Sequence, residues 1–112
     1  MKIAQENFDQ AIVVRLEGRL DAAAVRDERD TLVEAADQAK KWLIINMDKV
    51  DFIDSSGLGL IVSLVRRTRE HGSDLAMCNL TPQAQSLFEL TRMTKIFAVH
   101  ASEEAALEAA GL

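Results

Sequence analysis

The sequence predicts a single α/β domain whose sheet is mainly parallel and begins with an antiparallel β-hairpin. Two observations predict it. Short apolar stretches typical of buried strands alternate with longer segments of helical periodicity. Two strand-like stretches at the start, KIAQENF and AIVVRLEG, are separated by polar residues that suit a tight turn. The expected order is β-β-α-β-α-β-α-β-α, in one domain that spans residues 1–112.

The second strand is expected to end at Gly18, and Asp21 then has the character of a helix N-cap. The helix that follows should run to about Ala39. Its apolar residues share one face: Val25, Leu32, Val33 and Ala36. Its acidic residues lie on the other face, which we expect to be solvated: Asp27, Glu28, Asp30, Glu34 and Asp37.

The middle of the chain predicts a buried strand over KWLIINMD, a connection over DKVDFID and a helix from Ser56 to about His71. One apolar face of this helix carries Leu58, Ile61, Val62 and Val65. A second apolar row, Leu60 and Leu64, belongs either to the core or to a patch that faces a partner. Gly72 is the expected C-cap.

The last third predicts two further strands and two helices. DLAMCNL and KIFAVH are the strands. Thr81 caps the first helix, and Pro82 occupies its first position, where a missing N–H is tolerated. The final helix begins at Ala101 or Ser102 and extends to Ala110.

Composition limits the classes of function. The net charge of −5 argues against direct binding to nucleic acid, which requires clustered Lys and Arg. The single cysteine, Cys78, cannot form an intrachain disulfide, and its apolar neighbours predict a small buried side chain. No apolar signal region is visible at the start, and the longest apolar stretch, 57–65, is too short to span a membrane. We therefore expect a cytoplasmic, soluble protein that is a monomer or weak dimer.

The segment Asp54-Ser55-Ser56-Gly57 lies where a strand and its loop lead into a helix. Functional loops of open α/β sheets lie at the carboxyl ends of strands. The partial positive charge at the helix N-terminus could accommodate a phosphate on a serine hydroxyl. Gly57 and Gly59 carry no side chain, so another molecule could approach closely. From spacing alone, a simple helix start remains the alternative interpretation.

Three segments together resemble a known family. VDFIDSSGLGLIVSLVRR closely resembles the signature of the STAS domain, which is named for sulfate transporters and anti-sigma factor antagonists. EGRLDAA is similar to the Gly-x-Leu-Asp turn of that family, and LTPQAQSLFELTRMTKIF to its third helix and final strand. The resemblance extends from about residue 3 to residue 110. Arg92, where many members have glycine, and Asn46-Met47-Asp48 depart from the family pattern.

The resemblance implies a switch protein without enzymatic activity, an anti-sigma factor antagonist. Ser55 would be the phosphoacceptor, because it is the first serine after the aspartate of the motif. The kinase would be the anti-sigma factor itself, an ATP-dependent serine kinase, and a phosphatase of the PPM type would reset the switch. The expected partner-binding residues are Asp21, Asp54, Ser55, Ser56, Gly57, Leu58 and Leu60.

Other functions have weaker support. A constitutive STAS subunit, either of a lipid-transport ABC system or of a stressosome scaffold, keeps the fold without the switch. A receiver phosphorylated on Asp54 would need an acidic pair after its first strand, where only Glu17 occurs. His71 and His100 lack metal-ligand spacing, and neither a phosphate-binding P-loop nor a nucleophile elbow is present. We therefore expect no metal and no cofactor.

Overall fold

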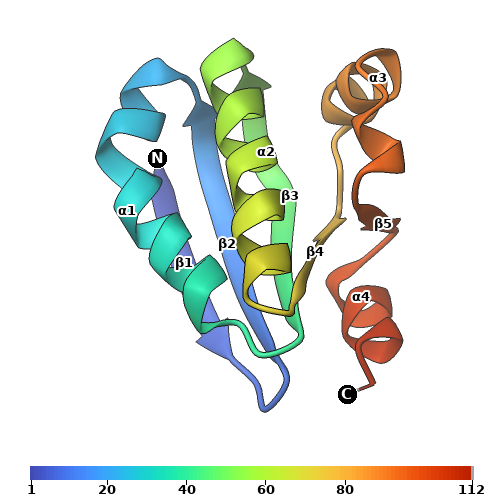
Figure 1. Ribbon diagram of the computed structural model, residues 1–112. Coiled ribbons are helices and arrows are strands. Elements are labelled where there is room, and N and C mark those ends of the chain that lie inside the picture. Colours follow the sequence, from blue (N-terminus) through green and yellow to red (C-terminus); the bar gives the residue numbers. More distant parts are fainter. Residues whose placement is uncertain (112) are drawn as a thin grey trace.

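The computed structural model describes residues 1–111 and contains one five-stranded sheet with the spatial order β1-β2-β3-β4-β5 (Figure 1). β1 is antiparallel to β2, and every other neighbouring pair is parallel. The strands are β1 (Lys2–Asn7), β2 (Ala11–Leu20), β3 (Trp42–Ile53), β4 (Asp74–Cys78) and β5 (Ala98–His100). The helices are α1 (Ala22–Gln38), α2 (Ser55–Glu70), α3 (Pro82–Leu90), the 3₁₀ turn η1 (Met93–Lys95) and α4 (Glu103–Ala109). This order confirms the predicted fold, including the opening hairpin.

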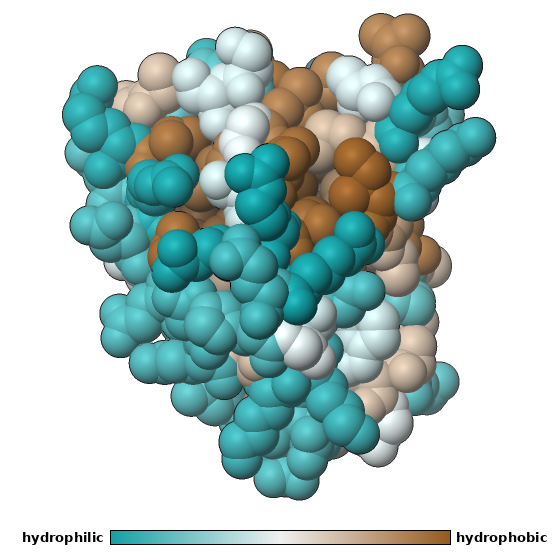
Figure 2. Space-filling view, in the orientation of Figure 1, coloured by the Kyte–Doolittle hydropathy of each residue, from teal (hydrophilic) through white to brown (hydrophobic). Residues whose placement is uncertain are grey.

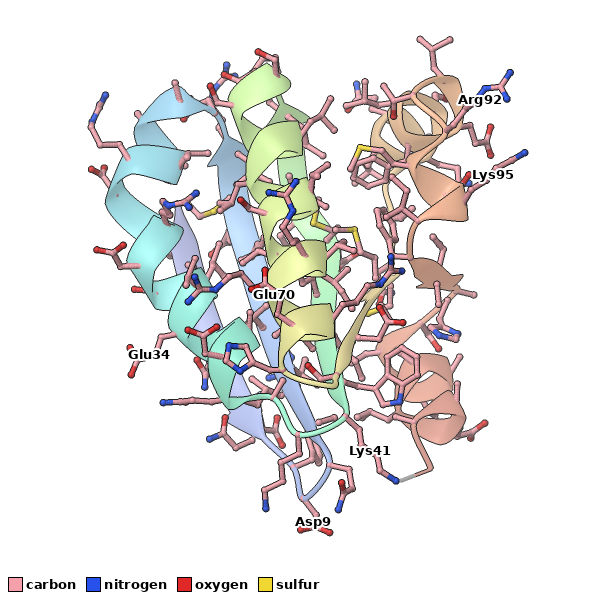
Figure 3. The ribbon with its side chains drawn as sticks, in the orientation of Figure 1. Asp9, Glu34, Lys41, Glu70, Arg92 and Lys95 are labelled. Carbon is pink, nitrogen blue, oxygen red and sulfur yellow. The ribbon has the colours of Figure 1, made fainter. Side chains whose placement is uncertain are left out.

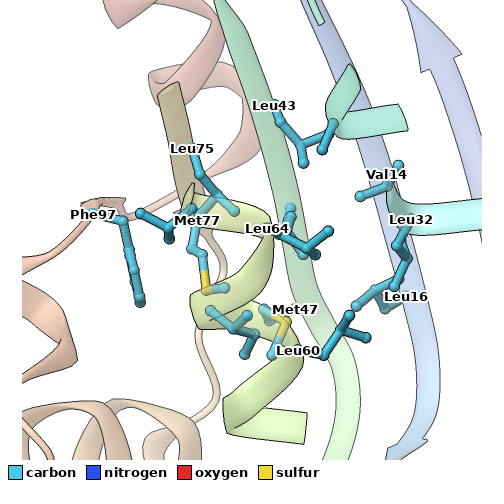
Figure 4. Close-up of a cluster of buried hydrophobic side chains, with 14 of the residues drawn as sticks. Val14, Leu16, Leu32, Leu43, Met47, Leu60, Leu64, Leu75, Met77 and Phe97 are labelled. Atoms are coloured by element: carbon cyan, nitrogen blue, oxygen red, sulfur yellow. The ribbon is translucent and has the colours of Figure 1, made fainter. Parts of the chain in front are cut away.

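The two faces of the sheet are covered by different helices. α1 and α2 lie side by side over β2 and β3 (Figure 1), where leucines such as Leu32, Leu43 and Leu64 form the main core (Figure 4). α4 packs on the opposite face, where Ala106 and Cys78 belong to a second buried cluster. Cys78 is 0% exposed, which confirms its prediction as a buried apolar side chain, and this burial raises the pKa of its thiol to about 12.

β2 and β3 are longer than predicted. The sequence predicted a strand end at Gly18 and a connection over DKVDFID, but β2 continues to Leu20 and β3 to Ile53. The two strands stay paired in parallel up to Leu20 and Ile53, and two shifts of register interrupt the ladder. Such irregularities break the alternation of buried and exposed residues on which a strand prediction depends. The extension carries the strand ends directly to the starts of the two helices.

The buried face of α2 also differs from the prediction. The side chains that enter the core are Leu60, Ile61, Leu64, Val65 and Thr68. Val62, predicted on the buried face, is 37% exposed, and Leu58 is half-buried. A helix that packs on a sheet and beside a second helix buries a wide stripe, and α2 contacts β3, β4 and α1. Leu60 and Leu64 are therefore core residues and not a partner-facing row.

The C-terminal third contains less strand than predicted. KIFAVH was expected to be a strand, but its first residue, Lys95, ends η1, and β5 begins only at Ala98. Arg92 adopts a left-handed conformation, with φ 61° and ψ 20°, immediately after α3. Glycine reaches this conformation at lower cost than arginine does, so arginine makes this turn less favourable than glycine would.

Within residues 1–111, no helix combines the length and the apolar character that a membrane-spanning segment requires.

Candidate functional site

The candidate site lies at the carboxyl ends of β2 and β3, where both strands lead directly into helices. Because these strands are parallel neighbours, the first turns of α1 and α2 lie next to each other at the upper end of the molecule (Figure 1). The Asp54 amide donates to the Leu20 carbonyl oxygen at 3.3 Å, which joins the two strand ends just before the helices begin.

Asp54 links the two helices through its carboxylate. Oδ1 accepts a hydrogen bond of 3.0 Å from the Gly57 amide and so caps α2. Oδ2 accepts a hydrogen bond of 3.1 Å from the Ala22 amide, at the first residue of α1. One carboxylate therefore satisfies backbone donors of two helix N-termini. Both carboxylate oxygens of Asp54 accept hydrogen bonds within the chain, which disfavours Asp54 as a phosphoacceptor. The bond to the Ala22 amide also places Asp54 next to the segment that contains Asp21, as expected for two residues of one site.

Asp21 caps α1 and contacts a cation at the same edge. Its Oδ1 accepts a hydrogen bond of 3.0 Å from the Ala24 amide, and its Oδ2 lies 3.4 Å from Arg19 Nε. The Ala24 amide, and secondarily Arg19, lower the pKa of the Asp21 carboxyl below its ordinary value. The Arg19 guanidinium also lies 4.0 Å from the centre of the Phe52 ring, a cation–π contact between β2 and β3.

Ser55 is the first residue of α2, and its side chain is exposed. Ser56, which follows it, is half-buried. Asp54 rather than Ser55 provides the cap, so the Ser55 hydroxyl is not needed to close the helix. A hydroxyl in this position is accessible to an enzyme, and it stands at the positive end of the α2 dipole.

Gly57 and Leu60, two of the expected partner-binding residues, are buried in the free chain. A Cβ atom on Gly57 would lie 2.3 Å from the Leu20 carbonyl oxygen, so its missing side chain allows α2 to pack against the end of β2. Leu60 is 2% exposed, within the core between helix and sheet. In the free chain these two residues shape the site from inside, and their expected contact with a partner stays a prediction. Leu58 is half-buried and packs against the same core.

A groove of about 230 Å³ adjoins the site between the end of β3 and the start of α3. Its wall on β3 includes Phe52, which is 40% exposed, and its wall on α3 includes Gln83 and Leu87. Sequence reasoning missed these residues because it placed Phe52 in the connection DKVDFID and assigned no site residue to the third helix. An aromatic residue two positions before the capping Asp54 was the available signal.

Comparisons with known proteins agree on one family and one fold. The model of the family described as the STAS domain matches residues 2–106. A protein named anti-sigma F factor antagonist, from Paenibacillus polymyxa, is 27% identical over 108 residues, which cover 96% of this chain and 92% of that protein.

Solved structures of the anti-sigma factor antagonist SpoIIAA are also similar. Its unphosphorylated form has a TM-score of 0.80 and 26% identity, with 99% of this chain and 98% of that chain covered. The phosphorylated form of the Bacillus protein has a TM-score of 0.74 and 28% identity, with 96% and 97% covered.

Proposed function

Because the chain belongs to the STAS domain family, we propose that it is an anti-sigma factor antagonist controlled by phosphorylation of Ser55. Relatives that match over nearly the full chain carry that name, and one similar structure is of a phosphorylated form. The partner is an anti-sigma factor with serine-kinase activity in the cytoplasm, and a PPM-type phosphatase removes the phosphate. The unmodified protein binds the anti-sigma factor and thereby releases a sigma factor.

The exposure of Ser55 at the start of α2 carries the proposal. In the modification step, Oγ of Ser55 forms a bond to the γ-phosphorus of ATP. The bond from that phosphorus to the β–γ bridging oxygen breaks, ADP leaves, and the hydroxyl proton passes to a base of the kinase. The first turn of α2 does not have to unfold for this reaction, because Ser55 is exposed and Asp54, not Ser55, caps the helix.

The added phosphate changes the site mainly through its charge. It brings about −1.5 to −2 charges next to the carboxylates of Asp54 and Asp21, and the α2 N-terminus partly compensates this within the chain. A partner that covers the unmodified site would have to desolvate the dianion or repel it. The modified protein therefore stays folded and loses its partner.

The test uses the purified chain and the anti-sigma factor kinase from the same genome. We expect ATP to label the wild-type chain once, on the peptide that contains Ser55, as read by mass spectrometry. Ser55→Ala should bind without being labelled. Ser55→Asp should bind at least about tenfold more weakly, because a carboxylate reproduces part of the repulsion.

Ser56→Ala is the matched control, because it removes the neighbouring hydroxyl and leaves Ser55 in place. It should be labelled and bound like the wild type. Labelling that persists in Ser55→Ala, or a Ser55→Asp protein that binds as tightly as the wild type, would contradict the proposed switch.

A further inference from the structure

α2 presents a continuous exposed stripe that begins at Ser55. Gly59, Val62 and Arg66 follow it at spacings of four, seven and eleven residues, which places all four on one side of a helix. Each of the four is exposed. The opposite side of α2 is buried against the sheet, so this stripe is the outward face of the helix that carries the proposed phosphoacceptor.

Gly59 has no role in packing within the chain. A Cβ atom built on it would meet no atom within 4 Å, in contrast to Gly57, where the same atom would collide with Leu20. A glycine inside a helix is less stable than an alanine, and here no internal contact compensates for that loss. Close approach of a second backbone over this turn is a physical reason for its presence.

An apolar groove lies beside the stripe, between α2 and the segment that follows η1. Val62, Val65 and Ile96 form its apolar lining, and its volume is about 470 Å³. Figure 2 shows this apolar surface as a hollow between α2 and the α3–η1 segment, with polar side chains on both sides. Arg69 fixes one wall, because its guanidinium donates to the Ile96 carbonyl oxygen and lies 3.3 Å from Asp74.

The rim of the groove is more basic than the rest of the molecule. Arg66 and Arg69 line it together with one acidic residue, Glu70, although the chain as a whole has a net charge of −5. Neither Arg66 nor Lys95, which directly precedes Ile96, forms an ion pair with any residue of the described range 1–111. Figure 3 shows Arg92 and Lys95 extending away from α2, so they do not line the groove. Arg66 is therefore the unpaired cation of the described lining, and a cation beside an apolar surface is complementary to an acidic amphipathic segment.

We propose that this surface, from Gly59 along Val62 to Arg66 with the groove beside it, binds an acidic amphipathic helix of the anti-sigma factor. The inference rests on the proposed function and extends it, because it adds a docking surface that continues from Ser55 along α2. The partner helix crosses α2 closely at Gly59, places an apolar side chain in the groove next to Val62, and presents a carboxylate to Arg66.

The test measures binding of the cognate anti-sigma factor kinase to four variants by titration calorimetry, at two salt concentrations. Val62→Asp and Arg66→Glu should each raise the Kd by about tenfold, and Arg66→Glu should also reduce the salt dependence of binding. Gly59→Ala should raise the Kd by a similar factor while it raises the Tm of the free chain by about 4 °C. Ser55→Asp reports on the proposed switch separately.

Two variants of α1 are matched controls. Thr31→Asp and Arg29→Glu repeat the same kinds of change on exposed positions of a different helix, and they should bind like the wild type. If Ser55→Asp weakens binding while Gly59→Ala, Val62→Asp and Arg66→Glu bind like the wild type, the docking surface is overturned and the switch stands. If the groove variants weaken binding and Ser55→Asp does not, the surface stands and the switch fails. A wild-type chain that forms no complex overturns both.

Discussion

Gly57 and Gly59 are separated by one residue on α2 but serve different purposes. Gly57 lets the helix pack against the end of β2, where even one methyl group would collide with the Leu20 carbonyl oxygen. Gly59 faces outward into open space. The sequence predicted the helix start and its capping Asp54, because these depend on local chemistry. It could not separate the two glycines, because their difference depends on which face of α2 meets the sheet.

Gly57→Ala should lower the free energy of unfolding by about 3 kcal/mol, since the backbone of β2 or of α2 has to move to admit the Cβ atom. Urea unfolding followed by circular dichroism measures this change. Gly59→Ala, on the same helix, is the control and should not destabilise the chain. Equal stability of Gly57→Ala and the wild type would show that the contact with Leu20 is easily relieved.

At the scale of elements, the order of strands and helices was predictable and the lengths of β2 and β3 were not. Periodicity identified the buried part of β3, from Leu43 to Met47, because every residue type there is apolar apart from Asn46. Beyond Asp48 the strand is held by pairing with β2 across irregular registers, and its side chains are mostly exposed. That pairing is a tertiary contact without a local signature, so the length of β3 beyond Asp48 could not be predicted.

α4 is attached to the sheet through a charged contact that the sequence also did not predict. Glu103, in the first turn of α4, accepts hydrogen bonds from Arg15 Nε and Nη2 at 2.8 and 2.7 Å, and from Asn46 Nδ2 at 3.0 Å. These bonds hold the pKa of Glu103 below its ordinary value, and the bonds from Arg15 are the largest cause. Because the Arg15 side chain is more than one third exposed, solvent screening keeps the contribution of this ion pair to the free energy of unfolding near 1 kcal/mol.

Glu103→Gln should therefore loosen α4 and expose the cluster beneath it, which contains Cys78. We expect the Cys78 thiol to react about fivefold faster with a disulfide reagent, because about 1 kcal/mol of local stability is lost. Glu104→Gln changes the adjacent, exposed acid and should leave the rate unchanged. An unaltered rate in Glu103→Gln would mean that apolar packing alone holds α4.

On the scale of the whole molecule, carboxylates with lowered pKa values cap one helix and fasten other elements to each other. Asp21 caps α1 at one end of the molecule, and Glu103 fastens α4 to the sheet. Asp37 joins α1 to α2 through Arg67 at 2.6 Å, and this partner is the main cause of its lowered pKa. Each carboxyl loses a proton more readily in the folded chain than in the unfolded chain.

The direction of the pH dependence follows from these shifts. A carboxyl with a lowered folded pKa contributes its full stabilisation above its unfolded pKa, and this contribution is lost as the pH falls through the folded value. The Tm should therefore be level near neutral pH and fall most steeply below about pH 4. Asp37→Asn should make the fall shallower, and thermal melts between pH 2.5 and 7 measure both profiles. A Tm that stays constant down to pH 3 would contradict these assignments.

The double role of Asp54 has a consequence for how a signal leaves this domain. Its carboxylate fastens the first turns of α1 and α2 to each other, so the two strand-to-helix connections behave as one rigid platform. A phosphate on Ser55 would be added to a helix start whose backbone is already held by the two hydrogen bonds of Asp54. Under the proposed switch, a partner would therefore sense the added charge and not a change of shape.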